Sequence, residues 1–306
     1  KVLSISTGDG HACGLLTNHQ ISCWGDFSET APGPFVKVAT AGDDFFCAVE
    51  YGGTLFCQGY NGATAPTVPA TGTYVAITAG AKHVCAIDGD SFVRCFGDNT
   101  YGQTSVTRGG PTLFSSVDVG LVHSCGIKKD GSLVCWGNND AGRSTPPSGS
   151  YSALSAGART SCAIRQTEKT LVCWGDGSND QLNYPGLVFL NVSVGDRYAC
   201  GVRYDLGLSC WGSGAPSGKP EGSYASVIAG SDHACAIRLA DNTVACWGYN
   251  AYGQASPPSG AFLSVSAGVY HTCGVKADAT VACWGNNSAG QSNPPSGEFR
   301  SAAVSS

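Results

Sequence analysis

Eight copies of one cysteine-bearing unit follow one another along this 306-residue chain, and no other feature constrains the fold as strongly. Clear copies read FLSVSAGVYHTCGVKADATVACWGNNSAGQSNPPSG from Phe262 and FSSVDVGLVHSCGIKKDGSLVCWGNNDAGRSTPPSG from Phe114. The first cysteine of a copy recurs every 34 to 40 residues, and the second follows it by 10 or 11. Such a period is the signature of a repeat architecture in which each copy is one supersecondary unit.

Each unit has the pattern of a small antiparallel sheet. In the last copy, Phe262–Ala267 alternates large and small residues, and turn residues separate it from expected strands at His271–Val275 and Thr280–Trp284. A further short strand is expected near Gly290-Gln291. A meander of about forty residues cannot bury both faces alone, so the units must stack, and radial stacking gives a propeller.

We therefore predict an all-β fold, a single β-propeller domain over residues 1–306 with eight blades of about 37 residues. The expected blades span residues 1–34, 35–72, 73–113, 114–150, 151–187, 188–223, 224–261 and 262–306. Both ends of the chain offer the same strand of the unit, at Val2–Thr7 and at Phe299–Val304. The sequence leaves open how the ring closes.

The cysteine pairs predict one local disulfide in each blade. Two cysteines that face each other on adjacent antiparallel strands lie about 4.5 Å apart at their Cα atoms, which a disulfide tolerates. The expected bridges are Cys13–Cys23, Cys47–Cys57, Cys85–Cys95, Cys125–Cys135, Cys162–Cys173, Cys200–Cys210, Cys235–Cys246 and Cys273–Cys283. Zinc sites need clustered cysteines, and each hairpin here has only two, so we expect no metal. Disulfides in this number indicate an oxidising compartment, and we expect a secreted protein whose export signal has been removed.

Composition narrows the possible functions. A net charge of −5 and a pI near 5.6 argue against a nucleic-acid partner, which would favour a basic face. No run of about 18 apolar residues predicts a membrane span. The sequence has no nucleophile elbow, zinc-protease motif or phosphate-binding glycine loop. We therefore expect a protein that is not an enzyme and carries no cofactor.

Positions shared by most copies are expected to serve the scaffold. A tryptophan follows the second cysteine in six copies, on the opposite face of its strand, and should wedge between neighbouring blades. A histidine stands two residues before the first cysteine in five copies, where a hydrogen bond from the ring to nearby backbone is the simplest role. A glycine three residues before the histidine position occurs in all eight copies, as a tight turn requires.

The two residues between that glycine and the histidine position differ from copy to copy. They are Asp9-Gly10, Asp43-Asp44, Ala81-Lys82, Leu121-Val122, Ala158-Arg159, Asp196-Arg197, Ser231-Asp232 and Val269-Tyr270. In a closed propeller these turns would ring one mouth of the channel. The candidate ligand-binding residues of this ring are Asp43, Asp44, Phe45, Lys82, Arg159, Arg197, Tyr198, Asp232 and Tyr270. A repeated pocket would indicate a lectin, whereas a varied ring favours one larger, asymmetric ligand.

The pattern AG-x-x-H-x-C-G-V…V-x-CWG-x-N-x-x-GQ resembles the regulator of chromosome condensation repeat superfamily. Within that superfamily, the chain is similar to the β-lactamase inhibitor protein II type of propeller. The cysteine pair around CWG is similar to that of plant Crinkly-type receptor kinase ectodomains. These families commonly have seven blades, whereas this chain has eight cysteine pairs. The resemblance implies a rigid disc whose face or channel mouth grips a partner.

The function expected from the sequence is therefore recognition of a protein or peptide partner on one face of the propeller, as in a receptor ectodomain or an inhibitor. A lectin that binds glycans at sites repeated around the ring is the alternative.

Overall fold

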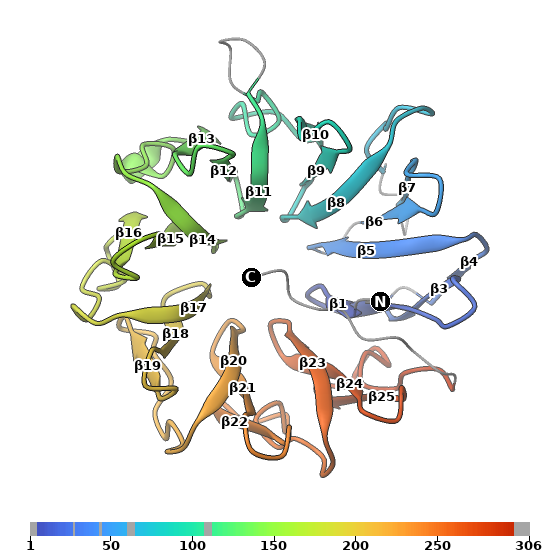
Figure 1. The fold of residues 1–306 in the computed structure, drawn as a ribbon. Coiled ribbons are helices and arrows are strands. Elements are labelled where there is room, and N and C mark those ends of the chain that lie inside the picture. Colours follow the sequence, from blue (N-terminus) through green and yellow to red (C-terminus); the bar gives the residue numbers. More distant parts are fainter. Residues whose placement is uncertain (1–4, 27, 43–44, 60–64, 107–111, 297–306) are drawn as a thin grey trace.

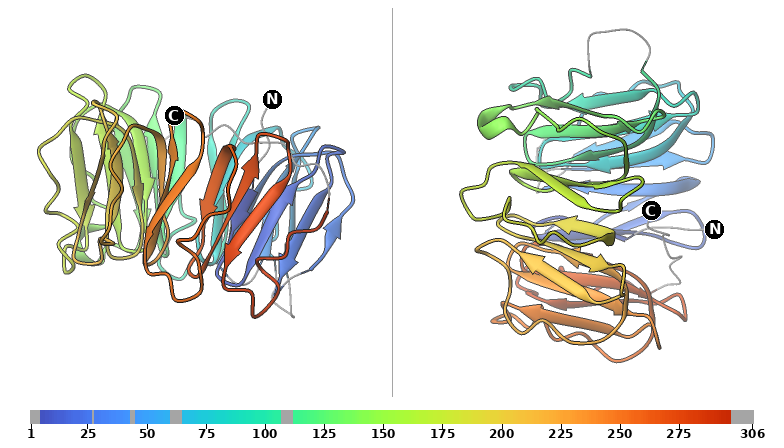
Figure 2. Two further views of the ribbon diagram at one scale, coloured as in Figure 1. Left: turned by 90° about the horizontal axis from the view of Figure 1, so that it is seen from below. Right: turned by 60° about the vertical axis from the view of Figure 1, so that its left-hand side comes forward.

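The computed structural model is a disc of eight antiparallel sheets arranged around a central channel (Figure 1). It describes residues 5–26, 28–42, 45–59, 65–106 and 112–296. The described residues contain almost no helix, one 3-10 turn at Asp140–Gly142 (η1). The predicted eight-bladed, all-β propeller is confirmed. Seen from its edge, the disc is one layer of blades with loops on its two faces (Figure 2).

Each blade has three main strands, and the first of them lines the channel (Figure 1). The inner strands are β1 (Ile5–Thr7), β5 (Phe35–Ala41), β8 (Tyr74–Ala79), β11 (Phe114–Val119), β14 (Tyr151–Ala156), β17 (Phe189–Val194), β20 (Tyr224–Ala229) and β23 (Phe262–Ala267). The middle strands are β2 (His11–Leu15), β6 (Phe45–Glu50), β9 (His83–Asp88), β12 (His123–Lys128), β15 (Thr160–Arg165), β18 (Ala199–Arg203), β21 (His233–Arg238) and β24 (His271–Lys276). The outer strands are β3 (Ile21–Gly25), β7 (Leu55–Gly59), β10 (Val93–Gly97), β13 (Leu133–Gly137), β16 (Leu171–Gly175), β19 (Leu208–Trp211), β22 (Val244–Gly248) and β25 (Val281–Gly285).

The fourth strand expected near Gly290-Gln291 is wrong for the eighth blade. In the described residues only blade 1 has a fourth strand, β4 (Thr30–Ala31). Near Gln291 the chain instead forms a loop held by its own side chains, because the Gln291 carboxamide oxygen accepts a hydrogen bond from the backbone N–H of Ala289. The Ser292 hydroxyl donates to the carbonyl of Asn286 and closes the same loop.

All eight predicted disulfides are present, one in each blade. The two cysteines of each pair stand directly opposite each other on the middle and outer strands, as Cys125 and Cys135 do. Their Cα atoms are 4.1 Å apart in that blade. The structure contains no free cysteine. Each bridge closes a loop of about ten residues, which removes conformational freedom from the unfolded chain.

The core lies between blades, where the disulfide of one blade packs against the tryptophan of the next. Cys85 and Cys95 of blade 3 belong to one hydrophobic cluster with Trp136 of blade 4, and Cys235 of blade 7 belongs to another with Trp284 of blade 8. The cysteines and the residue after the second cysteine occupy opposite faces of their sheet, so six of the eight blades offer a disulfide to one neighbour and a tryptophan to the other. Gln58 and Phe96 hold the tryptophan position in blades 2 and 3. The prediction that these tryptophans wedge between blades is confirmed.

Indole N–H groups tie several of these contacts together. Trp174, Trp211 and Trp284 each donate to a carbonyl in the loop of the preceding blade, at 2.9–3.0 Å. The acceptors for the last two belong to Gln181 and Gln254, and both residues stand at the glutamine position of the repeat, which Gly253-Gln254 and Asp180-Gln181 fill. A tryptophan that is buried and bonded in this way has no ring face to offer a sugar.

The ring closes by packing blade 1 against blade 8. Trp24 clusters with Cys273 and Val275, and its indole N–H donates to the carbonyl of Gln291 at 3.0 Å. The hydroxyls of Thr7 and Ser266 lie 2.9 Å apart across the same seam. In the described part of the chain, therefore, β1 supplies the inner strand of blade 1 and blade 8 is built from its own strands. Phe299–Val304 and the first residues of Val2–Thr7 lie outside the described residues.

Three buried histidines, His83, His123 and His233, contact a hydroxyl group of the next blade, a partner that the sequence prediction of bonds to nearby backbone did not include. Nε2 of His83 lies 2.8 Å from the hydroxyl of Ser124 in the next blade, and that hydroxyl donates to the carbonyl of Gln103. The hydroxyl must therefore accept from the ring, so His83 carries its proton on Nε2. Nε2 of His123 and of His233 make the equivalent contacts with Ser161 and Thr272 at 2.8 and 2.7 Å. Sequence reasoning missed these partners because they lie about 40 residues away in the chain.

Burial in these seams lowers the pKa of His83, His123, His233 and His271 from 6.5 to about 4. All four are fully enclosed by protein. Between pH 6.5 and pH 4 the histidines are protonated in the unfolded chain but stay neutral in the native protein. The free energy of unfolding therefore falls as the pH is lowered through this range. Below about pH 4 both states are protonated and these groups cause no further loss.

We therefore predict that the free energy of unfolding falls between pH 7 and pH 4.5, by up to about 3 kcal/mol for each histidine, and that the midpoint in guanidinium chloride falls with it. The variant His233→Tyr, which places in blade 7 the residue that blade 6 has as Tyr198, should take up fewer protons on unfolding and show a shallower loss. The measurement is the denaturation midpoint at four pH values for both proteins. A midpoint that does not change with pH would show that the histidines are charged in the fold.

Candidate functional site

One face of the disc carries the variable residues, and we call it the turn face. It is formed by the turns that connect the inner and middle strands together with the loops that follow the outer strands. Backbone bonds hold the two together in the blades whose turn and loop are described: the N–H of Asp98 donates to the carbonyl of Lys82, and the N–H of Asn138 to that of Val122. The hairpins that connect middle and outer strands form the opposite face.

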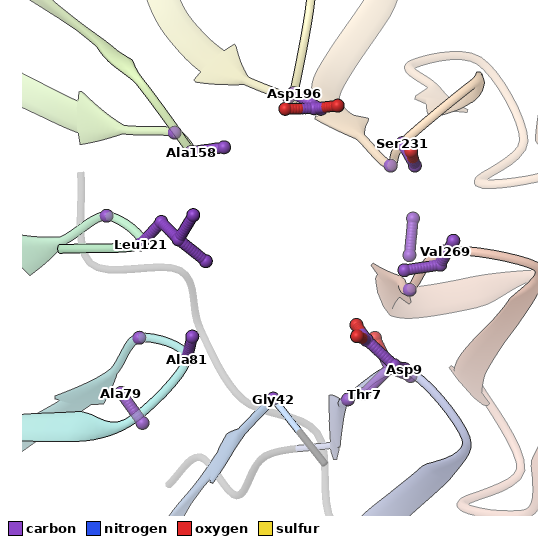
Figure 3. Close-up of a pocket in the computed structure, with 18 of the residues that line it drawn as sticks. Thr7, Asp9, Gly42, Ala79, Ala81, Leu121, Ala158, Asp196, Ser231 and Val269 are labelled. Carbon is purple, nitrogen blue, oxygen red and sulfur yellow. The ribbon is translucent and has the colours of Figure 1, made fainter.

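The channel opens on the turn face through a cavity of about 460 Å³ (Figure 3). Residues at the ends of the inner strands, such as Thr7 and Ala79, line part of this cavity. The other side chains around it come from the first variable residue of the turns, and we call these residues the channel ring. Its described members are Asp9, Ala81, Leu121, Ala158, Asp196, Ser231 and Val269. The mouth is therefore largely small and apolar, with carboxylates from blades 1 and 6 and a protruding Leu121 that is 43% exposed.

Below this ring, glycines bring the inner strands close enough to touch. A Cβ added to Gly120 would lie 2.3 Å from the carbonyl oxygen of Gly157, and one added to Gly268 would lie 2.6 Å from that of Gly8. The same relation links each glycine to the next blade around all eight blades, with Gly42 meeting the carbonyl of Ala81. Any side chain at these positions would force neighbouring blades apart. The glycine in every copy is thus explained by contact with the next blade as well as by the turn.

A belt of polar side chains two residues before the glycines joins the inner strands of neighbouring blades, and sequence reasoning missed it. The oxygens of Ser155 and Ser193 accept from the backbone N–H groups of Val194 and Ala229 in the next blade, at 3.1 and 3.0 Å. The carboxylate of Asp118 fills the same role in blade 4. The belt satisfies inner-strand amides that would otherwise face the channel without a partner.

Asp118 connects three blades. Its oxygens accept from the hydroxyl of Thr78 at 3.1 Å and from the backbone N–H groups of Ala156 and Val119 at 2.8 and 3.0 Å. Burial raises its pKa, and these bonds oppose the rise. With its acceptor positions already used by the scaffold, Asp118 is a structural residue of the channel wall.

The second variable residue of each turn points away from the channel, toward the outer loops, and forms the outer ring. Its described charged and aromatic members are Lys82, Arg159, Arg197, Asp232 and Tyr270. Arg197 pairs with Asp232 of the next blade at 2.6 Å, and Arg159 lies 3.8 Å from Asp176 in its own blade's loop. The predicted single ring of turns is therefore two rings with different surroundings.

The sequence prediction of site residues needs one correction. Phe45 and Tyr198 are 4% and 0% exposed, because the histidine position turns into the seam between blades. The Tyr198 hydroxyl donates to the carbonyl of His233, and burial raises the pKa of this phenol. Neither side chain can contact a ligand on the turn face. Asp43 and Asp44 lie outside the described residues.

Ordered loops give the turn face its shape. The backbone N–H of Ser178 is the main cause of the lowered pKa of Asp176, assisted by Arg143 and Arg159. A hydrogen bond from the Thr100 hydroxyl is the main cause of the lowered pKa of Asp98. Both carboxylates are thereby held ionised and in place at neutral pH.

Charge is distributed unequally between the two faces. The described turns and the first six residues of the described outer loops carry nine carboxylates against four cations. The carboxylates are Asp9, Asp26, Glu29, Asp98, Asp140, Asp176, Asp180, Asp196 and Asp232, and the cations are Lys82, Arg143, Arg159 and Arg197. The described hairpins of the opposite face are nearly balanced, with eight acidic residues and seven basic ones between Glu50 and Thr280. The acidity of the protein is thus concentrated on the turn face.

Three exposed tyrosines gather on the turn face over blades 7 and 8. The rings of Tyr249 and Tyr252 lie 6.2 Å apart, and those of Tyr252 and Tyr270 lie 5.5 Å apart. Only Tyr270 was singled out by the sequence, because the other two lie in the outer loop and not in the turns. We call this group the tyrosine corner.

The described residues offer neither a metal centre nor a membrane span. No three histidine, cysteine, aspartate or glutamate side chains among them come together in a way that could hold a metal ion. No helix in this part of the chain has the length and apolar character needed to cross a bilayer.

Comparison with known proteins places the fold. A family model for the regulator of chromosome condensation (RCC1) repeat matches residues 2–29, 74–103, 114–143, 225–254 and 262–291. Each matched segment starts at an inner strand and ends at the loop after the outer strand. Five of the eight repeats thus match the RCC1 repeat, and the fold is an RCC1-like β-propeller.

Solved structures similar to this RCC1-like propeller include plant receptor ectodomains. The CRINKLY WD40 ectodomain of the receptor kinase ACR4 from Arabidopsis thaliana is 25% identical, with 81% of this chain and 95% of that chain covered and a TM-score of 0.64. The entire ectodomain of the receptor kinase CR4 from Physcomitrella patens is 23% identical over 93% of this chain and 72% of that chain, with a TM-score of 0.65. Prp20p from Saccharomyces cerevisiae shares the fold at 15% identity, with 87% and 80% covered and a TM-score of 0.55.

We predict that Gly120→Ala destabilises this RCC1-like propeller by about 2 kcal/mol or more, because the new methyl group would overlap a backbone oxygen of the next blade. Gly186→Ala is the matched control, since a Cβ there meets nothing within 4 Å, and its effect should stay within about 0.5 kcal/mol. Urea unfolding of the two variants gives the comparison. Equal stabilities would contradict the close approach of the inner strands.

Proposed function

We propose that this propeller is a secreted, non-catalytic module that binds a protein or peptide partner on its turn face. The observation that carries the proposal is that each repeat contains two kinds of positions, one for the scaffold and one that varies on the surface. Cysteines, tryptophans and glycines build a rigid disc that is nearly the same in every blade, whereas the channel ring and the outer ring change chemistry from blade to blade. Eight disulfides support an oxidising compartment.

The arrangement of the turn face supports one composite site over many equal ones. Leu121 and Val122 present apolar surface in blade 4, Arg159 is a half-exposed cation in blade 5, and Tyr270 is an exposed aromatic in blade 8. A glycan lectin would repeat one set of pocket residues. A large asymmetric ligand needs different contacts at each point, which protein interfaces combine as aromatic anchors and charged rims.

Rigidity adds to this argument. A partner that binds a surface already in its bound shape loses less conformational entropy than one that must order loops. The ion pair of Arg197 with Asp232 and the bonds that hold Asp98 and Asp176 arrange the outer ring before any partner arrives. Similarity to the ectodomain of the receptor kinase ACR4 supports the same mode.

The proposal predicts that binding partners are lost when the turn face is altered and kept when the opposite face is altered. Leu121→Asp with Arg159→Asp changes the turn face at two exposed residues. Tyr204→Asp with Leu239→Asp is the matched pair on the opposite face, where the side chains are 66% and 50% exposed. The protein and both variants are to be tested against an array of secreted proteins and an array of glycans, after thermal unfolding has shown that all three are folded.

We expect the turn-face pair to weaken each protein interaction by about tenfold or more, since altered hot-spot residues cost about 1.4 kcal/mol or more each. The opposite-face pair should leave binding unchanged. Binding that is lost only in the opposite-face pair would place the site elsewhere. Binding of glycans alone, with several equivalent sites per molecule, would establish the lectin alternative.

A further inference from the structure

The tyrosine corner is an unusual surface for a soluble disc. Tyr249, Tyr252 and Tyr270 are 46%, 50% and 41% exposed, although aromatic rings of this size are usually buried. Their planes meet at 67° and 65°, so the rings form the walls of a corner and not a flat shelf. Two of the tyrosines come from blade 7 and one from blade 8, which fixes the corner across a seam.

The scaffold holds the corner in place. The backbone N–H of Tyr249 donates to the carbonyl of Asp232, and that of Tyr252 donates to the buried carboxamide of Gln254. The Gln254 carbonyl in turn accepts the indole N–H of Trp284 in the next blade. The corner is therefore positioned by the same contacts that join blades 7 and 8, and its rings do not depend on mobile loops.

The position of Tyr252 in its loop recurs in blade 3 as Tyr101, which is 53% exposed. The turn residue of the following blade is Tyr270 in the first case and Val122 in the second. Tyr101 is thus an exposed tyrosine of the same face without the facing ring that completes the corner. Tyr101 therefore serves as a control for the effect of pairing the rings of Tyr252 and Tyr270.

The aromatic faces and the charge around the tyrosine corner determine which chemical group it can bind. Aromatic faces carry partial negative charge and attract cations, with larger effect where water is displaced. The described turns and the first six residues of the outer loops carry five more carboxylates than cations. The backbone carbonyl of Asp232 accepts the N–H of Tyr249, while the Asp232 carboxylate is paired with Arg197, so the negative field at the corner comes from the face as a whole. An acidic group would be repelled here. A guanidinium or ammonium group is attracted both by the faces of the tyrosine rings and by the negative potential of the turn face.

Resting on the function proposed above, we propose that the tyrosine corner is the anchor site for an arginine or lysine side chain of the protein partner. The partner therefore presents a basic segment to blades 7 and 8. Its hydrocarbon stem packs along the rings while the charged end lies over a ring face. The remaining turn face then contacts the surface of the partner on either side of this segment.

The test uses two labelled peptides, Gly-Ser-Gly-Arg-Gly-Arg-Gly-Ser and the same sequence with citrulline at both arginines. Citrulline keeps the shape of arginine and removes its charge. Fluorescence anisotropy with the full chain at low salt measures both. We expect the arginine peptide to bind at least about fivefold more tightly, and the difference to shrink as salt is raised.

Substitutions identify the rings. Tyr252→Leu and Tyr270→Leu should each weaken binding of the arginine peptide by about fivefold, whereas Tyr252→Phe, which keeps the ring face, should retain most of it. Tyr101→Leu on the same face and Tyr204→Leu on the opposite face should have no effect. These residues are exposed, so thermal unfolding should be the same for all variants.

Three results would overturn the assignment: no measurable binding of the arginine peptide, equal binding of the citrulline peptide, or equal loss in Tyr101→Leu. A separate comparison tests the broader proposal that the turn face binds the partner. If the turn-face double variant abolishes partner binding while Tyr252→Leu and Tyr270→Leu leave it intact, the turn face is the binding surface and the tyrosine corner is not its anchor.

Discussion

Packing of a disulfide against the tryptophan of the next blade is the interaction on which this structure depends. A three-stranded sheet has two apolar faces and no helix to cover either of them. Each sheet therefore needs a neighbour on both sides, and the cysteine face and the tryptophan face are the complementary halves of that contact. Because the disulfide lies between the middle and outer strands, it fixes the surface that the neighbouring tryptophan meets. Local covalent bonds and long-range packing thus reinforce each other at the same place.

The fold was predictable because the eight copies of the repeat within the chain can be compared with one another. Eight copies show which positions are common, and the spacing of Cys273 and Cys283 identifies the hairpin, its register and its bridge. Contacts between copies were harder to predict. The partner of His83 is Ser124, and the partners of Asp118 are in blades 3 and 5, at separations set by how adjacent blades are staggered. Nothing in the local pattern encodes that stagger.

The candidate site shows the same limit. The sequence located the variable turns and so found Lys82, Arg159, Arg197, Asp232 and Tyr270. It could not show that successive residues of one turn face different surroundings, one toward the channel and the next toward the outer loop. It placed Phe45 and Tyr198 on the surface, because the histidine position is next to the turn in sequence while its side chain enters the seam. Tyr249 and Tyr252 form a site with Tyr270 only because loop and turn of adjacent blades meet, and the spacing of aromatic residues along the outer loop was the one available signal.

The seam between blades 8 and 1 is built like the five other seams that contain a tryptophan, with Trp24 clustered with Cys273, and a hydroxyl pair joins its inner strands. Open solenoids expose an end repeat at each terminus, and those ends fray and need polar caps. A closed array has no ends to fray, so no blade of this disc can be lost from the edge. Opening it anywhere requires two surfaces to part along their whole height at once. The width of the channel is then set by the number of blades, so it can change only by the gain or loss of a whole repeat.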